Sequence, residues 1–172
     1  SMMARQHSAL FPTLKELDIG FVAFSPMANG FLTGAYGKGE RFDAKTDYRA
    51  AMPQFTDEAV EKNSALLELL RDTAAKHGAT PAQISLAWMI DRPEHIVPIP
   101  GSRKPERMRE NLAAGEVNLS AAEVAELDAA LDDFPQLEYD GLYSYTDGTA
   151  ELVDGLATVN EETARQKAAD FL

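Results

Sequence analysis

Apolar residues in the first three quarters of the chain follow helix-like and strand-like patterns in turn. Leu10, Leu14 and Leu17 recur at helical spacing, and residues 21–24 then form a short apolar run. Such a run predicts a strand buried on both faces, as in a parallel sheet covered by helices. Residues 96–99 form a second apolar run with β-branched side chains, and they predict a second strand.

Capping signals place helices between and after these two strands. Thr56 begins a helix with acidic residues in its first turn, and Gly78 ends it. Residues 80–83 resemble a capping box, with proline at the first position of a largely apolar second helix. Pro105 opens a helix directly after the second strand, and residues 120–123 form another capping box. Helices thus alternate with strands, which predicts an α/β fold.

The segment 35–55 has no clean period and is rich in glycine, charge and aromatic residues. It predicts a long surface loop, which in an α/β fold lies over a ligand-binding edge. Phe42, Tyr48 and Phe55 have two interpretations. We expect them to pack the loop onto its own body, and the alternative is that they cover a cofactor.

The junction between the second strand and the helix at Pro105 is a candidate anion site. Gly101 allows a sharp turn or a close backbone approach, and the helix start directs free N–H groups and a positive dipole end to one place. Arg103, Lys104 and Arg107 add cations there. The pattern fits a phosphate site, and it equally fits an ordinary strand-to-helix loop with a solvated basic face.

The composition of the chain limits the classes of molecule that it is expected to bind. The 172 residues carry a formal net charge of −12, which disfavours nucleic acid and anionic membranes as partners. A basic cluster on this acidic background suits a small anionic ligand. The chain has no cysteine, hence no disulfide or cysteine metal site, and no apolar run reaches the length of a membrane span. These features are compatible with a cytoplasmic protein, which is our expectation.

Two segments resemble a known family. Residues 99–107, followed by Glu110 and Asn111, resemble the cofactor-binding segment near the C-terminus of aldo-keto reductases. Residues 20–34 are similar to the strand-seven segment of the same family. The two occur in the right order and at about the right distance. The resemblance covers roughly residues 1–132 and implies the C-terminal part of a (β/α)8 TIM barrel, from helix six to strand eight and the closing helices. Residues 133–172 are then an acidic C-terminal extension of unknown role.

The resemblance implies that the chain binds a nicotinamide dinucleotide, and the cations favour NADPH, the reduced form of NADP, over NADH. Three groups of residues fall on the family's binding positions. The pyrophosphate would pass Ser25, Pro26, Met27, Gly30 and Leu32; the 2′-phosphate would meet Gly101, Ser102, Arg103, Lys104 and Arg107; the adenine would be held by Glu110 and Asn111. Without the resemblance, Glu110 and Asn111 would be assigned to a solvent-facing helix.

The catalytic residues of the family have no counterpart that we can place in this chain. Aldo-keto reductases transfer a hydride from the nicotinamide to a carbonyl while a tyrosine, tuned by a lysine–aspartate pair, protonates the oxygen and a histidine orients the substrate. Neither Tyr36 and Tyr48 nor His7, His77 and His95 match those motifs. We therefore assign no catalytic residue to this chain.

Two parallel strands are a quarter of a barrel, so each strand is expected to present a free edge beside exposed apolar surface. We therefore expect a truncated or cleaved piece, or a chain that assembles with other copies or a companion segment. One hypothesis is that the chain is a portion of an NADPH-dependent oxidoreductase, which reduces a small carbonyl substrate once the missing part of the barrel is supplied. The alternative is a non-catalytic nucleotide-binding or interaction module, or a truncated gene product.

Overall fold

The structure is a computed structural model that describes residues 1–3, 10–92 and 96–133. By its contacts the chain divides into two units, Ser1–Tyr139 and Asp140–Leu172. The first unit contains all of the described residues. The second unit lies outside them, as does the predicted acidic extension from residue 134 on.

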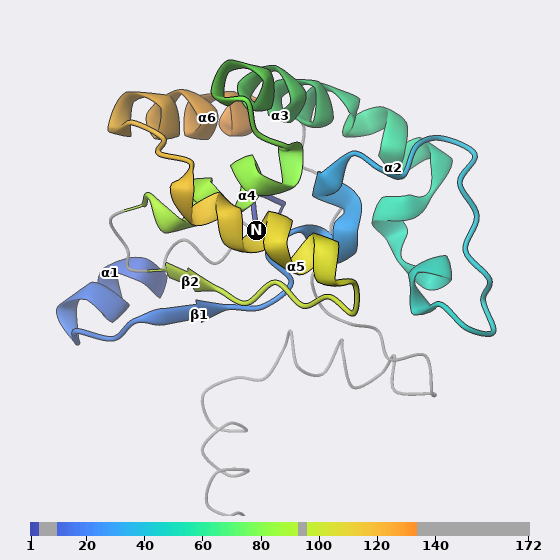
Figure 1. The fold of residues 1–172 in the computed structure, drawn as a ribbon, viewed down its shortest axis with the longest axis horizontal. Helices are drawn as coiled ribbons and strands as arrows, with labels where there is room; N and C mark the ends of the chain where they lie inside the picture. Colours follow the sequence, from blue (N-terminus) through green and yellow to red (C-terminus); the bar gives the residue numbers. More distant parts are fainter. Residues whose placement is uncertain (4–9, 93–95, 134–172) are drawn as a thin grey trace, which may run out of the picture. The chain divides into compact units, whose positions relative to one another are not determined.

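Two parallel strands form the sheet of the first unit. β1 (Phe21–Ala23) pairs with β2 (Ile96–Pro98), with Val22 opposite Val97, and Figure 1 shows the two side by side. The Ile99 N–H extends the ladder by donating to the Ala23 carbonyl at 3.0 Å. Both predicted strands and their parallel pairing are therefore present, each strand being shorter than its apolar run.

The prediction that residues 21–24 are buried on both faces is wrong for this chain. Ala23 and Ile96 are buried, whereas Val22 and Val97, which point to the opposite face, are 60% and 56% exposed. Phe24 and Ile99 are also exposed just beyond the strands. In the described part of the chain, helices cover only one face of the sheet, so the apolar side chains of the other face meet solvent.

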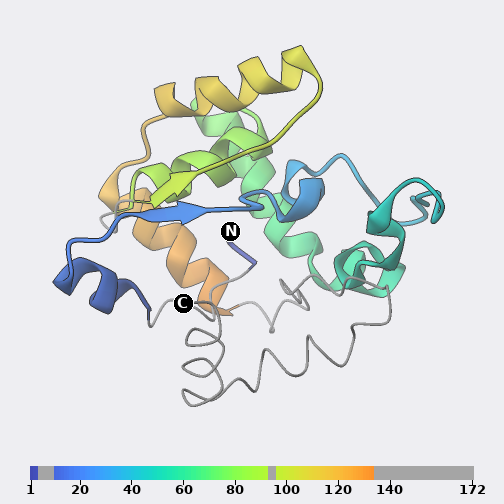
Figure 2. The ribbon, with the colours of Figure 1, turned by 90° about the horizontal axis from the view of Figure 1, so that it is seen from below.

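Helix α4 (Pro81–Ile90) is the central element of the core. It contacts α3 (Ser64–His77), β2, α5 (Pro105–Leu112) and two 3-10 helices, η2 (Ala28–Thr33) and η5 (Ala113–Glu116). Figures 1 and 2 show it between the sheet and α3. The predicted capping box is confirmed, because Thr80 Oγ1 accepts from the Gln83 N–H and Gln83 Oε1 accepts from the Thr80 N–H. A helix buried on almost every side explains why its sequence shows little amphipathic periodicity.

The helix predicted from Thr56 to Gly78 is two helices. α2 (Asp57–Lys62) and α3 are separated at Asn63, which is completely buried with φ −93° and ψ 6°. The Asn63 side-chain amide donates to the Ala59 carbonyl at 2.7 Å, so it competes with the backbone for a helical acceptor. The cap at Thr56 and the left-handed stop at Gly78 are confirmed.

The remaining elements frame this core. α1 (Leu10–Glu16) precedes β1, two short 3-10 helices lie in the long loop (η3, Tyr48–Ala51, and η4, Pro53–Phe55), and α6 (Ala121–Asp133) ends the described part. The predicted capping box at 120–123 is confirmed, since the Glu123 N–H donates to Ser120 Oγ and the Ser120 N–H to Glu123 Oε2. None of the described helices is long and apolar enough to cross a membrane.

Candidate dinucleotide-binding site

The segment that follows β1, which we call the β1 loop (residues 25–34), has an unusual backbone. Ser25, Ala28 and Asn29 adopt positive φ angles of 44°, 50° and 57°, and Gly30 has φ 96°. Three consecutive residues in this region coil the loop tightly, at a cost in conformational energy for the non-glycine residues. A loop held in this way at the carboxyl end of a parallel strand is a typical place for ligand binding.

Contacts with the core hold the β1 loop in this shape. Phe31 and Leu32 are completely buried, and the buried Ser85 hydroxyl of α4 donates to the Pro26 carbonyl at 3.4 Å. Inside the loop, the Thr33 hydroxyl donates to the Gly30 carbonyl at 2.6 Å. Pro26 and Leu32 are therefore buried residues that shape the loop, while Ser25, Met27 and Gly30 are half-buried and remain accessible to a ligand.

The loop after β2, which we call the β2 loop (residues 99–104), is built differently. A Cβ placed on Gly101 would meet nothing within 4 Å, and Gly101 is not among the residues with positive φ. Neither its backbone nor its packing in the described chain requires glycine at this position. Open space before this glycine fits the close approach of a ligand.

The predicted phosphate-binding cations lie on the β2 loop and the first turn of α5, which opens with Pro105 as the sequence predicts. Arg103, Lys104 and Arg107 are all exposed. No side chain caps the helix, and the Ser102 hydroxyl instead accepts from the Lys104 N–H at 3.1 Å. Because β1 and β2 are parallel neighbours, their two loops start at the same edge of the sheet.

Glu110 and Asn111, predicted to hold the adenine, are half-buried and do not face solvent fully. The Glu110 carboxylate accepts from the Thr80 hydroxyl at 2.7 Å, and its carbonyl accepts from the Gln83 side chain at 3.1 Å. Glu110 thus ties α5 to the start of α4. A role in binding adenine stays a prediction for both residues.

An aromatic cluster in the loop 35–55 confirms that this loop packs onto its own body. The Phe42 ring lies 4.9 Å from that of Phe55 and 5.3 Å from that of Tyr36, between centroids. The Arg49 guanidinium lies over the rings of Tyr36 and Phe42 at 4.8 and 4.3 Å. Tyr48 is the exception, because it is exposed and its hydroxyl donates to Asn29 Oδ1 in the β1 loop at 3.1 Å.

Two arginines lower the pKa of the Tyr36 hydroxyl, Arg49 of the same loop and Arg107 of α5. Burial alone would raise the pKa of Tyr36, but hydrogen bonds and positive charge from Arg49 and from Arg107 outweigh it, so the pKa lies below its ordinary value.

The histidines have no shared site in the described chain. His77 Nε2 lies 2.7 Å from Glu123 Oε1 and joins α3 to α6, while His7 and His95 lie outside the described residues. Among the described residues, no three His, Asp or Glu side chains are placed to hold a metal ion.

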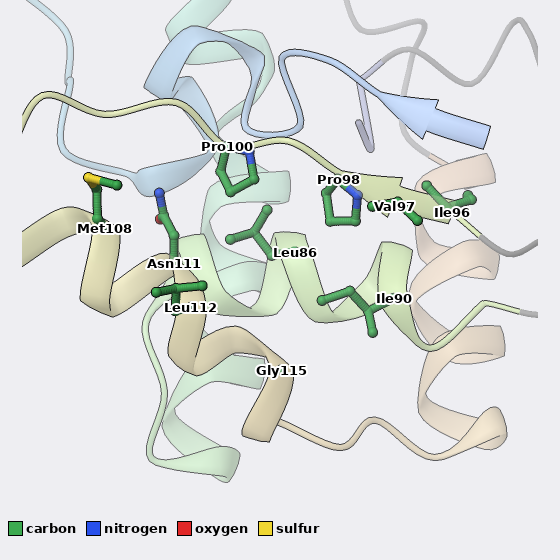
Figure 3. Close-up of a pocket in the computed structure, with 10 residues that line it drawn as sticks. All are labelled: Leu86, Ile90, Ile96, Val97, Pro98, Pro100, Met108, Asn111, Leu112 and Gly115. Atoms are coloured by element: carbon green, nitrogen blue, oxygen red, sulfur yellow. The ribbon is translucent and has the colours of Figure 1, made fainter. Parts of the chain in front are cut away.

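An apolar groove of about 470 Å³ lies between β2, α4 and α5 and reaches the β2 loop at Pro100 (Figure 3). Its lining includes Ile90, Val97, Met108 and Leu112, and Leu112 is 78% exposed. Asn111 is the only predicted binding residue that lines it. The groove is thus a feature of the outer side of β2, and the predicted dinucleotide site is at the strand ends.

The sequence profile of the Aldo/keto reductase family matches residues 1–132. The chain belongs to the aldo/keto reductase family. Two curated members are similar to it: an aldo-keto reductase, str7, from Strobilurus tenacellus (35% identical over 117 residues) and a probable aldo-keto reductase 1 from Glycine max (37% identical over 118 residues). The aligned parts cover 68% and 69% of this chain and 34% of each relative, so the chain spans about a third of their length.

Solved structures of aldo-keto reductases have a similar fold. The thermostable aldo-keto reductase Tm1743, solved with the inhibitor epalrestat, is 26% identical, with a TM-score of 0.51 over 74% of this chain and 36% of that protein. A glycerol dehydrogenase from Gluconobacter oxydans has a TM-score of 0.63 over 80% of this chain and 41% of its own, at 20% identity, which is evidence of fold alone. The α/β arrangement of this aldo/keto reductase chain is thus that of TIM-barrel proteins.

Proposed function

We propose that this chain is the cofactor-binding C-terminal portion of an NADPH-dependent aldo-keto reductase. One observation carries the proposal: two parallel strands bring the β1 loop and the β2 loop to one edge, where Arg103, Lys104 and Arg107 are exposed. Arginine suits this place because its guanidinium can donate two hydrogen bonds to a phosphate and stack on adenine. The family membership over residues 1–132 supports the same assignment.

The residues present fit a dinucleotide. The open space at Gly101 lets a ligand approach the backbone, and the uncapped start of α5 favours an anion. The β1 loop, with its accessible Ser25 and Gly30, would hold the pyrophosphate between the two strand ends. When bound, NADPH would supply a hydride for a carbonyl carbon. This chain would hold and orient it, and the groups that protonate the carbonyl oxygen would come from a part of the protein outside this chain.

A titration of the 172-residue chain with NADPH, followed by the fluorescence of the nicotinamide, tests the proposal. Saturable binding that weakens as salt rises is the expected result, because the phosphate contacts are exposed charges. Absence of saturable binding by a folded chain would contradict the assignment. Carbonyl-dependent oxidation of NADPH by this chain alone would contradict the proposal that the catalytic groups lie elsewhere.

The sheet favours assembly with a companion segment. Val22, Val97, Phe24 and Ile99 expose one apolar face, and the apolar groove adjoins β2 on its outer side. The Ile99 N–H points to β1, and successive residues of a strand direct their backbone groups to opposite sides, so the backbone of Pro98 points to the free edge of β2. Because proline has no N–H, this position leaves no unpaired donor at the edge. We propose that a further part of a (β/α)8 barrel, in this or another polypeptide, covers this surface.

Light scattering coupled to size-exclusion chromatography tests the companion segment. The chain alone should self-associate in a salt-insensitive manner, and co-expression with the first two thirds of the Glycine max relative should give a one-to-one complex. A folded monomer that does not bind that partner would contradict the proposed companion segment.

A non-catalytic nucleotide-binding module is the second candidate. The two tyrosines that the structure describes are engaged in packing or loop contacts, Tyr36 with Arg49 and Tyr48 with Asn29. Binding of NADPH without turnover in any assembly would favour it. A cytoplasmic location stays a prediction of the sequence. The division at residues 132 and 133, with an acidic extension after it, also stays a prediction.

A further inference from the structure

The two capping boxes of this chain use their hydrogen-bond donors differently. In the box that opens α6, Glu123 Oε2 accepts from the Ser120 N–H at 2.9 Å and from the Ser120 hydroxyl at 2.7 Å. The hydroxyl proton of this box therefore stays inside it. We call this arrangement a closed box.

The box that opens α4 has a glutamine in place of that glutamate. Gln83 Oε1 accepts from the Thr80 N–H at 2.9 Å, but the Thr80 hydroxyl donates to Glu110 Oε1 of α5 at 2.7 Å. The side-chain amide of Gln83 also donates to the Glu110 carbonyl at 3.1 Å. Because an amide has N–H donors that a carboxylate lacks, this box directs two donors to one residue of another helix.

Glu110 is thus held at its backbone and at its side chain. The bond from the Thr80 hydroxyl is charge-assisted, and the start of α4 is a place where the helix dipole favours a negative charge. Thr80, Gln83 and Glu110 are all half-buried. The rotamer freedom of this glutamate is therefore lost on folding, and a ligand that contacts it does not have to restrict it again.

The second oxygen of the Glu110 carboxylate is available to a ligand. Within the described ranges 1–3, 10–92 and 96–133, no hydrogen bond or ion pair uses Glu110 Oε2. A carboxylate oxygen can only accept, so it favours a ligand group that donates. Adenine has such a group, the amino group at C6. Hypoxanthine has a carbonyl oxygen at the same place, which a carboxylate would repel.

We infer that Thr80 and Gln83 are positioning residues: the capping box of α4 holds the Glu110 carboxylate so that its second oxygen accepts from the amino group of the adenine. This role rests on the proposed function and on the prediction that Glu110 and Asn111 hold the adenine. It extends the dinucleotide site from α5 to the start of α4, and it allows the chain to distinguish adenine from hypoxanthine.

Gln83→Glu is the test, because it gives α4 the closed box seen at Ser120 and Glu123. The substituted side chain can accept the Thr80 proton, cannot donate to the Glu110 carbonyl, and repels the Glu110 carboxylate. Nicotinamide fluorescence measures the affinities for NADPH and for reduced nicotinamide hypoxanthine dinucleotide phosphate. The two ligands have the same charge, so their affinity ratio is insensitive to general electrostatics. The unaltered chain should prefer NADPH, and the variant should reduce that preference about three- to tenfold.

Substitutions of Thr80 provide a second route to the same answer. Thr80→Asp keeps a residue that caps helices well but removes the hydroxyl proton, so it should reduce the preference as Gln83→Glu does. Thr80→Ser returns a hydroxyl and should restore the preference. Ser120→Asp makes the same change in the closed box and should alter the preference less than about twofold. Circular dichroism and the unfolding midpoint would show that each variant is folded.

A double-mutant cycle with Glu110→Ala shows whether the box acts through Glu110. In the Glu110→Ala protein, Gln83→Glu should change the preference less than about twofold. A further loss there would contradict the role of Glu110. Full preference for NADPH in both Gln83→Glu and Thr80→Asp would overturn the positioning role.

The outcomes distinguish this inference from the proposed function. If the unaltered chain binds NADPH and the hypoxanthine analogue equally, Glu110 does not accept from the amino group, and only the inference is wrong. If the unaltered chain binds neither dinucleotide, both the proposed function and the inference are wrong.

Discussion

The β1 loop and the β2 loop begin at the same edge of the sheet, and each contains a glycine that the family resemblance assigns to cofactor binding. Gly30 has a positive φ and a Tyr36 ring against it, so the fold itself requires glycine there. Gly101 has neither a positive φ nor a neighbour within 4 Å of a Cβ. The β1 loop is therefore constrained by the fold, whereas nothing in the described fold requires glycine at position 101, which agrees with the binding role that we propose for the β2 loop.

The largest expected effect is on the stability of the β1 loop. Gly30→Ala should lower the free energy of unfolding by about 1–3 kcal/mol, because alanine is strained at this φ and its Cβ meets Tyr36. Chemical denaturation followed by circular dichroism measures it. Gly37→Ala is the control, since Gly37 has no close neighbour or positive φ, and it should stay within about 0.5 kcal/mol. Equal stability of both variants would remove the contrast between the loops.

The next effect is on binding by the β2 loop. Replacing both Arg103 and Lys104 by alanine should weaken NADPH at least about tenfold, because charge-assisted hydrogen bonds contribute about 1.5–3 kcal/mol each and the side chains are exposed. NADH should be affected much less. The double variant of Lys15 and Lys76 to alanine removes the same charge from exposed positions elsewhere. If that control weakens NADPH equally, general electrostatics and not a phosphate site explains the binding.

A smaller effect separates the two glycines directly. Gly101→Ala should leave the free energy of unfolding within about 0.5 kcal/mol and weaken NADPH and NADH severalfold, because the added methyl group occupies space before the backbone. Titration calorimetry and denaturation measure the two quantities on one sample. A stable variant with unaltered affinities would show that no ligand approaches this glycine.

The smallest effect concerns the pairing of α3 with α6 through His77 and Glu123, and it appears only in acid. Hydrogen bonds from the Ser120 backbone and hydroxyl, together with His77, lower the pKa of Glu123 from 4.5 to about 2. A depressed carboxyl pKa stabilises the fold above the unfolded value, and the contribution is lost as pH falls from about 4.5 to about 2. Glu123→Gln should therefore flatten the decline of unfolding free energy in this window. An unchanged pH profile would show that Glu123 is not coupled to folding.

Local signals predict much of this architecture. The caps at Thr56 and 80–83 use side chains that bond within three residues, so the sequence contains the whole interaction. The break at Asn63 is not predictable in this way, because an asparagine inside an apolar helical pattern gives no sign that it will be buried and bond the Ala59 carbonyl. The exposure of Val22 does not follow from its own segment, whose apolar run predicts burial on both faces. It follows only from the family resemblance, which implies that two strands lack the rest of a barrel.

The candidate site also contains residues that the sequence predicts and residues that it does not. Arg103 and Lys104 can be found from the sequence, because their loop lies between a strand and a helix start and matches a family segment. The packing of Tyr36 cannot, since it arises from contacts with Arg49 and with the backbone at Gly30, in segments whose sequence shows no clean period. Sequence patterns identify ligand-facing loops more readily than the residues that hold them.

The central claim is that the cations after β2 bind the 2′-phosphate of a dinucleotide. Amide chemical shifts of the labelled chain, recorded while adenosine 2′-phosphate or adenosine is added, test it most directly. We expect adenosine 2′-phosphate to shift the amides of residues 101–107 in a saturable, salt-sensitive manner, with adenosine producing far smaller changes. Equal shifts from the two compounds, or shifts confined to other parts of the chain, would contradict the claim.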